Sequence, residues 1–280
     1  MAAYAGKVVI VTGASQGIGK ALCLELAAQG PRLVLAARDR AALAEVAAAC
    51  VSRGAETLVV PTDVADEASC RALVAATVER FAGVDVLVNN AGVGLLARFE
   101  DVTDLSQYER LMRVNYLGSV YPTYFALPHL KRSRGQVVAV SSLAGLCGVP
   151  MRTAYAATKH AQMGFFDSLR IELRETGVSV TVIAPYFVQS EIRRRSPGPD
   201  GRTVEASPIR EDEIMSAEEC ARQMLRAMER RQRILVMTLK GKLGRWLGLA
   251  FPGLVDHLAA EAVSSLRPPP PPRGARGARR

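Results

Sequence analysis

Short apolar runs rich in β-branched residues recur along this chain, and each is followed by a longer stretch whose composition suits a helix. The strand-like runs cover residues 7–12, 33–37, 57–61, 84–89, 136–141 and 178–184. Runs that are apolar at nearly every position are typical of parallel strands buried on both faces. The alternation with helical segments therefore predicts an α/β fold, with one doubly wound parallel sheet in a single domain and helices on both faces.

The pattern loosens after the sixth run. Residues 1–238 are predicted to form the sheet domain, including a long polar loop at about residues 186–215 of the kind that covers a binding site. Ser216 is expected to cap a helix that continues to about Arg231, and residues 234–237 are expected to form a last edge strand. An apolar helical extension is predicted at 239–266, followed by a disordered proline- and arginine-rich tail at 267–280.

Two interpretations of the extension at 239–266 stay open. Its apolar residues, flanked by Lys240, Lys242 and Arg245, suit a helix in peripheral contact with a membrane surface. We favour the alternative, a helix pair that packs on the domain, closes the pocket or lines a dimer interface. No stretch reaches the roughly 18 uninterrupted apolar residues of a membrane-spanning helix, so we expect no transmembrane anchor.

Composition excludes some classes of function. The formal net charge of +9 owes much to the arginines of the tail. Because the tail has no folded recognition motif, a solvated low-complexity end is favoured over nucleic-acid binding. The five cysteines form no C-x-x-C pair, which indicates reduced thiols in the cytoplasm. The three histidines are scattered without ligand spacing, so we expect no metal site.

The first apolar run leads into a glycine-rich turn. Gly13, Gly17 and Gly19 follow the run at 7–12 and precede a stretch that favours a helix. Their spacing, G-x-x-x-G-x-G, is not the usual dinucleotide fingerprint G-x-G-x-x-G. The order of strand, glycine turn and helix N-terminus nevertheless presents backbone N–H groups to a phosphate, and Ser15 offers a further donor.

The end of the second run indicates which dinucleotide is bound. An NAD site usually has Asp or Glu at this position, where the carboxylate accepts hydrogen bonds from the ribose 2′-OH. This chain has Ala37 and then Arg38. A guanidinium matches a 2′-phosphate in charge and in the geometry of its donors. The sequence therefore favours NADP(H) over NAD(H).

Three residues predict the chemistry of the site. Tyr155 and Lys159 are four positions apart, so they share one face of a helix, and Ser142 precedes them at the end of the fifth apolar run. A nearby ammonium favours the phenolate and lowers the pKa of a tyrosine, which suits proton transfer near neutral pH. Tyr155 would then protonate a carbonyl oxygen that Ser142 holds in place. This predicts an enzyme that reduces a ketone or oxidises a secondary alcohol.

The motifs together resemble those of the short-chain dehydrogenase/reductase superfamily, over roughly residues 5–240 and on its doubly wound Rossmann fold. The matching segments are residues 12–19, the pair 63–64 and the segment 89–92. The resemblance implies a catalytic tetrad of Asn115, Ser142, Tyr155 and Lys159. In it, Asn115 supports a water that relays protons to Lys159, which also binds the nicotinamide ribose. The cofactor contacts implied by the motifs and the resemblance are Gly13, Ser15, Gln16, Gly17, Ile18, Gly19, Arg38, Asp63, Val64, Asn90, Ala91, Gly92, Tyr155, Lys159, Pro185, Val188 and Ser190.

One position departs from the family pattern, because Tyr186 follows Pro185 where the family has glycine. A tyrosine there argues against a positive φ, and its ring suits an apolar substrate pocket. Segments around 108–122 and 152–170 resemble 3-ketodihydrosphingosine reductases and 11β-hydroxysteroid-type dehydrogenase/reductases, respectively. The resemblance thus implies a lipophilic substrate and a homodimer or homotetramer. A non-catalytic NADP(H)-binding regulator and a lipid-surface binding protein are the alternatives of another class.

Overall fold

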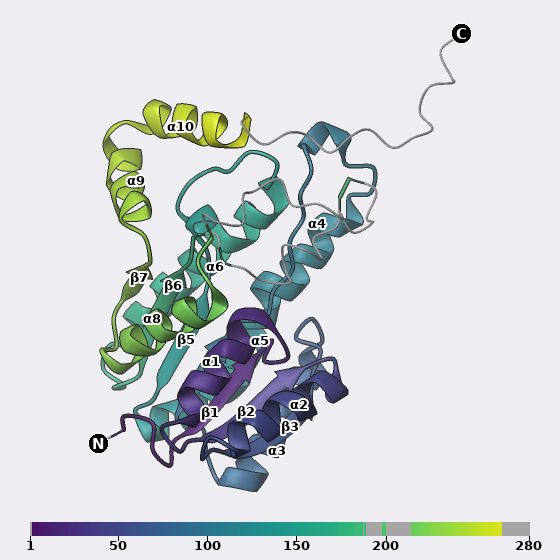
Figure 1. Ribbon diagram of the computed structural model, residues 1–280, viewed down its shortest axis with the longest axis vertical. Coiled ribbons are helices and arrows are strands. Elements are labelled where there is room, and N and C mark those ends of the chain that lie inside the picture. The colour runs from purple at the N-terminus through teal and green to yellow at the C-terminus, as the bar shows by residue number, and fades with distance from the viewer. Residues whose placement is uncertain (1, 187, 189–197, 200–213, 265–280) are drawn as a thin grey trace.

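A seven-stranded parallel sheet organises the molecule, as predicted (Figure 1). The computed structural model describes residues 2–186, 188, 198–199 and 214–264. The strands are β1 (Val8–Thr12), β2 (Arg32–Ala37), β3 (Glu56–Pro61), β4 (Val86–Asn89), β5 (Gln136–Val140), β6 (Ser179–Ala184) and β7 (Ile234–Val236). Their order in the sheet is β3-β2-β1-β4-β5-β6-β7, so the direction of winding reverses between β1 and β4. Ligands bind at such a switch point, outside the carboxyl ends of the strands.

Helices cover both faces of the sheet. The helical segments are α1 (Gly17–Ala27), α2 (Arg40–Val51), α3 (Glu67–Phe81), η1 (Phe99–Asp101), α4 (Ser106–Leu111), η2 (Met112–Leu117), α5 (Gly118–Ser133), η3 (Leu143–Gly145), α6 (Thr153–Glu172), α8 (Ala217–Glu229), α9 (Leu239–Ala250) and α10 (Pro252–Ser264). One core cluster joins α1, α2 and α8 to the sheet, and a second joins α3, α5 and α6 to its other face. Successive strand residues alternate between them: Val9 belongs to the first cluster and Ile10 to the second.

The two elements expected beyond β6 are both present. Ser216 caps α8, since its hydroxyl accepts a hydrogen bond from the Glu219 N–H at 3.1 Å. β7 pairs in parallel with β6 and forms the edge of the sheet. The loop expected at about 186–215 lies largely outside the described residues, and the tail expected at 267–280 lies wholly outside them.

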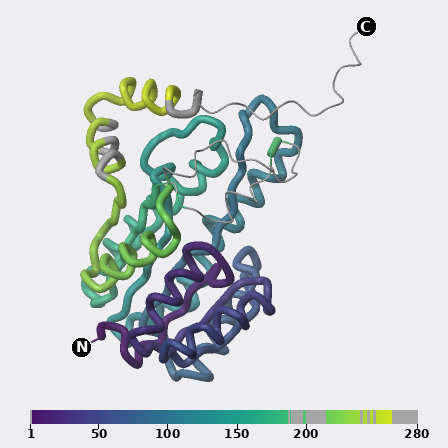
Figure 2. The backbone as a smooth tube through the Cα atoms, viewed as in Figure 1, coloured from purple at the N-terminus to yellow at the C-terminus, as the bar shows by residue number. Residues whose placement is uncertain are grey.

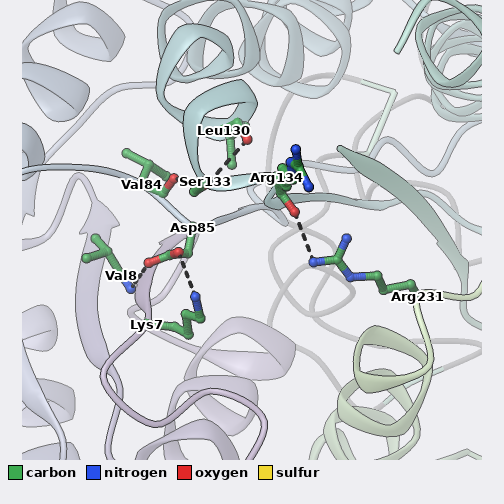
Figure 3. Close-up of polar contacts among 8 residues, drawn as sticks. All are labelled: Lys7, Val8, Val84, Asp85, Leu130, Ser133, Arg134 and Arg231. Carbon is green, nitrogen blue, oxygen red and sulfur yellow. Dashed lines mark hydrogen bonds and ion pairs between the residues drawn. The ribbon is translucent and has the colours of Figure 1, made fainter. Parts of the chain in front are cut away.

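The amino ends of the strands are tied together by side chains (Figure 3). The Asp85 carboxylate accepts hydrogen bonds from the Val8 N–H at 2.9 Å and from the Lys7 ammonium at 3.2 Å. Arg231 donates to the Arg134 carbonyl at 3.0 Å. The strand expected at 84–89 begins at Val86, directly after the aspartate that makes these contacts.

Tyr4 anchors the start of the chain at this same edge. The residue is 5% exposed, and its hydroxyl donates to Gln136 Oε1 at 3.3 Å. Its backbone N–H donates to Gln29 Oε1 at 3.1 Å. The first residues therefore pack against the foot of β5, at the amino ends of the strands.

The segment expected to be an apolar extension folds as two helices that project past the end of the sheet (Figure 2). The break between α9 and α10 coincides with Pro252, which occupies the first turn of α10. Gly241 of α9 is buried against the side chain of Leu143 in η3. Several large apolar side chains of the pair are exposed, namely Leu243, Trp246, Phe251, Leu254 and Leu258. No helix among the described residues is long and apolar enough to cross a membrane.

Candidate active site

A cavity of about 470 Å³ opens at the carboxyl ends of the strands. This volume is in the range of small-molecule and cofactor sites. It brings together most of the residues that the sequence selected, which are Gly13, Ser15, Gln16, Gly17, Ile18, Arg38, Asp63, Val64, Asn90, Ala91, Gly92, Ser142, Tyr155, Lys159, Pro185 and Val188. Gly19 and Asn115 are buried and do not line it, and Ser190 lies outside the described residues.

The glycine loop is held tightly between β1 and the segment after β4. Gly13 adopts a φ of +66°, which favours glycine. A Cβ atom on Gly19 would lie 2.2 Å from the Gly13 carbonyl oxygen, so no side chain fits there. The Asn90 amide donates to the Thr12 carbonyl at 2.9 Å, and the Asn90 N–H donates to the Thr12 hydroxyl at 3.0 Å. These contacts fix the path of the loop.

The beginning of α1 suits a phosphate group. Its N-cap residue, Gln16, makes no side-chain capping bond, and its first turn contains no acidic residue. The helix therefore presents backbone N–H groups and the positive end of its dipole to the cavity that Gln16 and Gly17 line. The donors present here fit the diphosphate of a dinucleotide.

The end of β2 carries a carboxylate that caps a helix and a guanidinium without an ion-pair partner among the described residues. Asp39 caps α2, because its Oδ1 accepts a hydrogen bond from the Ala42 N–H at 3.0 Å. Arg38 is exposed, lines the cavity and forms no ion pair with any residue that the structure describes. The group available to a ribose or its phosphate is thus the guanidinium.

Tyr155 lies in the first turn of α6, half-buried at the inner end of the cavity. Burial raises the pKa of its phenol, while the Arg152 guanidinium and a hydrogen bond with Ser142 act to lower that pKa. The Arg152 guanidinium carbon lies 5.7 Å from the centre of the Tyr155 ring. The sequence had assigned this lowering to Lys159. In the structure the two opposing groups are Arg152 and Ser142.

Lys159 is buried beneath Tyr155, with 3% of its surface exposed. Its Nζ lies 5.5 Å from the centre of the Tyr155 ring. The amine donates to the Val140 carbonyl and to Gln162 Oε1, both at 2.9 Å. Burial lowers the pKa of Lys159 to about 7. Near neutral pH the side chain therefore exchanges between ammonium and amine.

Asn115 lies in η2, a stretch of π-helix between α4 and α5. Both N–H donors of its side-chain amide are engaged in hydrogen bonds within the fold. The amide donates to the Val93 carbonyl at 3.0 Å and to the Thr158 hydroxyl at 2.9 Å. Its Oδ1 accepts from the Val93 N–H at 2.8 Å. Asn115 thus joins the loop after β4 to α6, and only its backbone carbonyl is directed to the side chains around Lys159.

Two further residues contact the site and were not selected from the sequence. Gln162 binds Lys159, and Arg152 lies over the ring of Tyr155. The only sequence signal was spacing, because Gln162 is three residues after Lys159 and Arg152 three before Tyr155, which places each pair on one side of a helix. Tyr186 lines the cavity beside Pro185 and has no positive φ, as its identity predicted.

Comparison with known proteins agrees with this arrangement. The family model for short chain dehydrogenase matches residues 7–199. Similar curated proteins include a dehydrogenase/reductase SDR family protein 7-like of Dictyostelium discoideum, 34% identical over 94% of this chain and 83% of that protein. An 11-beta-hydroxysteroid dehydrogenase A of Sesamum indicum is 36% identical over 90% of this chain and 74% of its own. An alcohol dehydrogenase from the archaeon Thermococcus sibiricus, solved with 5-hydroxy-NADP, superposes with a TM-score of 0.68 at 26% identity, covering 80% of this chain and 90% of that one.

Proposed function

Because the chain belongs to the short-chain dehydrogenase family, we propose that it is an NADP(H)-dependent oxidoreductase that interconverts a lipophilic ketone and its secondary alcohol. The family is one of oxidoreductases that act on alcohols and ketones with a nicotinamide cofactor. The observation that carries the proposal is one cavity lined by a guanidinium at the end of β2, by Ser142 after β5, and by Tyr155 and Lys159 of α6. The cofactor and substrate named here extend this family assignment.

The proposed chemistry places proton transfer on Tyr155. When bound, the reduced nicotinamide supplies the hydride to the carbonyl carbon. The Tyr155 hydroxyl donates its proton to the carbonyl oxygen, and Ser142, which is hydrogen-bonded to Tyr155, holds that oxygen in position. The Arg152 guanidinium over the ring and the hydrogen bond with Ser142 favour the phenolate that results, and the Lys159 amine lies 5.5 Å from the ring centre. In the oxidative direction the same phenolate accepts the proton of the alcohol.

The preference for NADP(H) is proposed from the end of β2. Arg38 offers its charge and forked donors to a 2′-phosphate. Asp39, the nearest carboxylate in sequence, binds the backbone of α2 instead. The related alcohol dehydrogenase was solved with an NADP derivative, which is consistent with the same choice.

The lipophilic substrate is proposed from the walls of the cavity and from the relatives. Val93, Pro185 and Tyr186 are among the residues that line it. Several relatives are named as 11-beta-hydroxysteroid dehydrogenases. Those names favour a steroid-like ketone over 3-ketodihydrosphingosine, the other lipid substrate that the sequence indicated.

Assembly and location complete the proposal. Tyr124 of α5 and Ile171 of α6 are 71% and 73% exposed, respectively. Such apolar surface on neighbouring helices supports a homodimer or homotetramer formed through them. All five cysteines are free, which supports a reducing, cytoplasmic environment.

The test is to follow NADPH and NADH oxidation with ketones that include steroid ketones and 3-ketodihydrosphingosine. We expect turnover with NADPH that Tyr155→Phe abolishes, while NADPH still binds, because the phenylalanine keeps the ring but lacks the proton. We expect Arg38→Asp to weaken NADPH by roughly 10- to 100-fold, as is typical for loss of a charge-assisted hydrogen bond. The NADH activity of that variant should be kept.

Three results would contradict the proposal. Undiminished turnover in Tyr155→Phe would remove the tyrosine from the chemistry. A wild-type preference for NADH would remove the role of Arg38. Tight NADPH binding without reduction of any ketone would favour the non-catalytic regulator.

A further inference from the structure

A buried chain of hydrogen bonds connects Asn115 to Lys159 through the side chain of Gln162. Gln162 lies on α6, one turn after Lys159, and is 1% exposed. Its Oε1 accepts from Lys159 Nζ at 2.9 Å. Its Nε2 donates to the Asn115 carbonyl at 2.8 Å and to the Ser119 hydroxyl at 2.7 Å. The carboxamide thus spans the gap between η2 and the lysine.

The contacts fix which way the amide of Gln162 is turned. If oxygen and nitrogen were exchanged, the NH₂ group would face the Lys159 amine, and the oxygen would face the Asn115 carbonyl. Donor would then meet donor and acceptor would meet acceptor. Only the orientation with Oε1 toward Lys159 satisfies both ends, so Gln162 accepts from the lysine.

We propose that Gln162 is a positioning residue of this site, whose carboxamide fixes the Lys159 amine beneath Tyr155 by linking it to the backbone of Asn115. The inference rests on the proposed reductase function. The resemblance to the superfamily implied a water between Asn115 and the lysine. In this chain a side chain makes the connection directly.

The geometry explains why two acceptors matter. An ammonium has three N–H donors. Val140 at the end of β5 and Gln162 on α6 each accept one, from two different elements of the fold. The third donor is left for the cavity, which Lys159 lines. If Val140 were the only acceptor, one contact would hold the Lys159 amine, and its orientation would no longer be fixed.

The polar surroundings of Lys159 are otherwise neutral. Among the described residues, the hydrogen-bond acceptors of its amine are a carbonyl and an amide oxygen, and burial is the cause that lowers the lysine's pKa. Tyr155, whose ring centre lies 5.5 Å from the amine, is a titratable group of the same helix. The other charged side chains that line the cavity in the described part of the chain are Arg38, Asp39, Asp63 and Arg110, and none of these four is hydrogen-bonded to Lys159. Substitution of Gln162 can therefore change the charge state of the lysine while Tyr155 itself stays in place.

The experiment compares Gln162→Leu with Gln162→Glu, which change the pKa of Lys159 in opposite directions. Leucine removes one acceptor and disfavours the ammonium, whereas glutamate adds a negative charge and favours it. The titration of Lys159 is followed by NMR of protein with ¹³C-labelled lysine, assigned with Lys159→Met. The pH dependence of kcat is measured in parallel. We expect the pH midpoint of the Lys159 titration to fall in the leucine variant and to rise in the glutamate variant. The part of the pH–kcat curve that depends on Lys159 should shift to lower and higher pH in the same way. A fall of one unit lowers the ammonium population above the midpoint about tenfold.

Gln136→Leu is the matched control. Gln136 is also buried and fully hydrogen-bonded, but it lies at the amino end of β5, away from the cavity. The Gln136→Leu variant should be less stable than wild type, with no change in the midpoint of the Lys159 titration or of the pH–kcat curve. The same midpoint of the Lys159 titration in wild type and in Gln162→Leu would overturn the inference. If Gln162→Glu does not fold, the leucine variant alone tests the role of Gln162. The NMR titration needs no turnover, so it tests Gln162 even if no ketone is reduced and the proposed function fails.

Discussion

At the scale of single residues, the site combines groups that are costly to bury. Lys159 is almost fully enclosed and has only neutral hydrogen-bond acceptors. Its pKa falls from 10.5 to about 7 because burial disfavours the ammonium. The folded protein therefore holds this lysine less readily in its charged form than the unfolded chain does. The lysine to which we propose a role in the chemistry thus lowers stability.

The stability of Lys159→Met should reveal this cost. Below about pH 7 both states of the wild type carry the ammonium, and the folded state bears the full penalty of burial. Between about pH 7 and 10.5 only the unfolded state keeps the proton, so wild-type stability rises with pH. The advantage of methionine over lysine should therefore shrink by roughly 2 to 3 kcal/mol between pH 6 and pH 9. Urea unfolding at the two pH values measures it.

The exposed Lys131 provides the comparison for that experiment. Lys131→Met should change the free energy of unfolding equally at pH 6 and pH 9. If the change in the free energy of unfolding caused by Lys159→Met were also the same at pH 6 and pH 9, the folded protein would accommodate the ammonium without penalty.

At the scale of elements, α9 packs against η3, which directly follows Ser142. An ideal Cβ on Gly241 would lie 2.8 Å from Leu143 Cδ1, so the helix approaches η3 as closely as glycine allows. Leu143 directly follows Ser142. A side chain at 241 would therefore displace either α9 or the residue next to the serine.

We predict that Gly241→Ala loosens this contact. The chain's single tryptophan, Trp246, lies on α9, so its fluorescence anisotropy should fall in the variant. The KM for the ketone should rise several-fold, while the affinity for NADPH stays unchanged, because the glycine loop is part of a different element. Adding Leu143→Ala makes room for the methyl group and should restore the anisotropy.

Gly253 of α10 is the control, because nothing lies within 4 Å of its ideal Cβ. Gly253→Ala should be neutral or add roughly 0.5 to 1 kcal/mol of helix stability. If Gly241→Ala behaved in the same way, α9 would not be seated on Leu143.

The elements also show what the sequence could and could not predict. The strands and the glycine turn were predictable because an apolar run and the order of strand, turn and helix are local in the chain. The π-turn at Asn115 was not, since its bonds to Val93 and Thr158 form only when α6 packs beside η2. Gln162 was missed for the same reason: its partners Asn115 and Ser119 lie more than 40 residues away.

At the scale of the whole molecule, the two helices α5 and α6 leave apolar surface exposed on the outside of the sheet. Tyr124 and Ile171 are its most exposed members. We predict that Tyr124→Lys combined with Ile171→Lys reduces the mass of the particle to that of one chain, because a buried lysine pair is not tolerated at an interface. Light scattering after size-exclusion chromatography measures the mass.

Val51→Lys on α2 changes an exposed apolar residue on the opposite face and should leave the assembly intact. If the wild type is itself monomeric, the exposed surface of α5 and α6 has another use.

The burial of Tyr4 has a practical consequence for handling the protein. Its bonds to Gln136 and Gln29 keep the first residues at the amino ends of the strands, whereas the cavity opens at the carboxyl ends. A biotin or fluorescent dye joined ahead of Tyr4 would thus emerge on the side of the sheet remote from the cavity. Protein immobilised on a biosensor chip in this way would present its cofactor and substrate openings to the flowing solution.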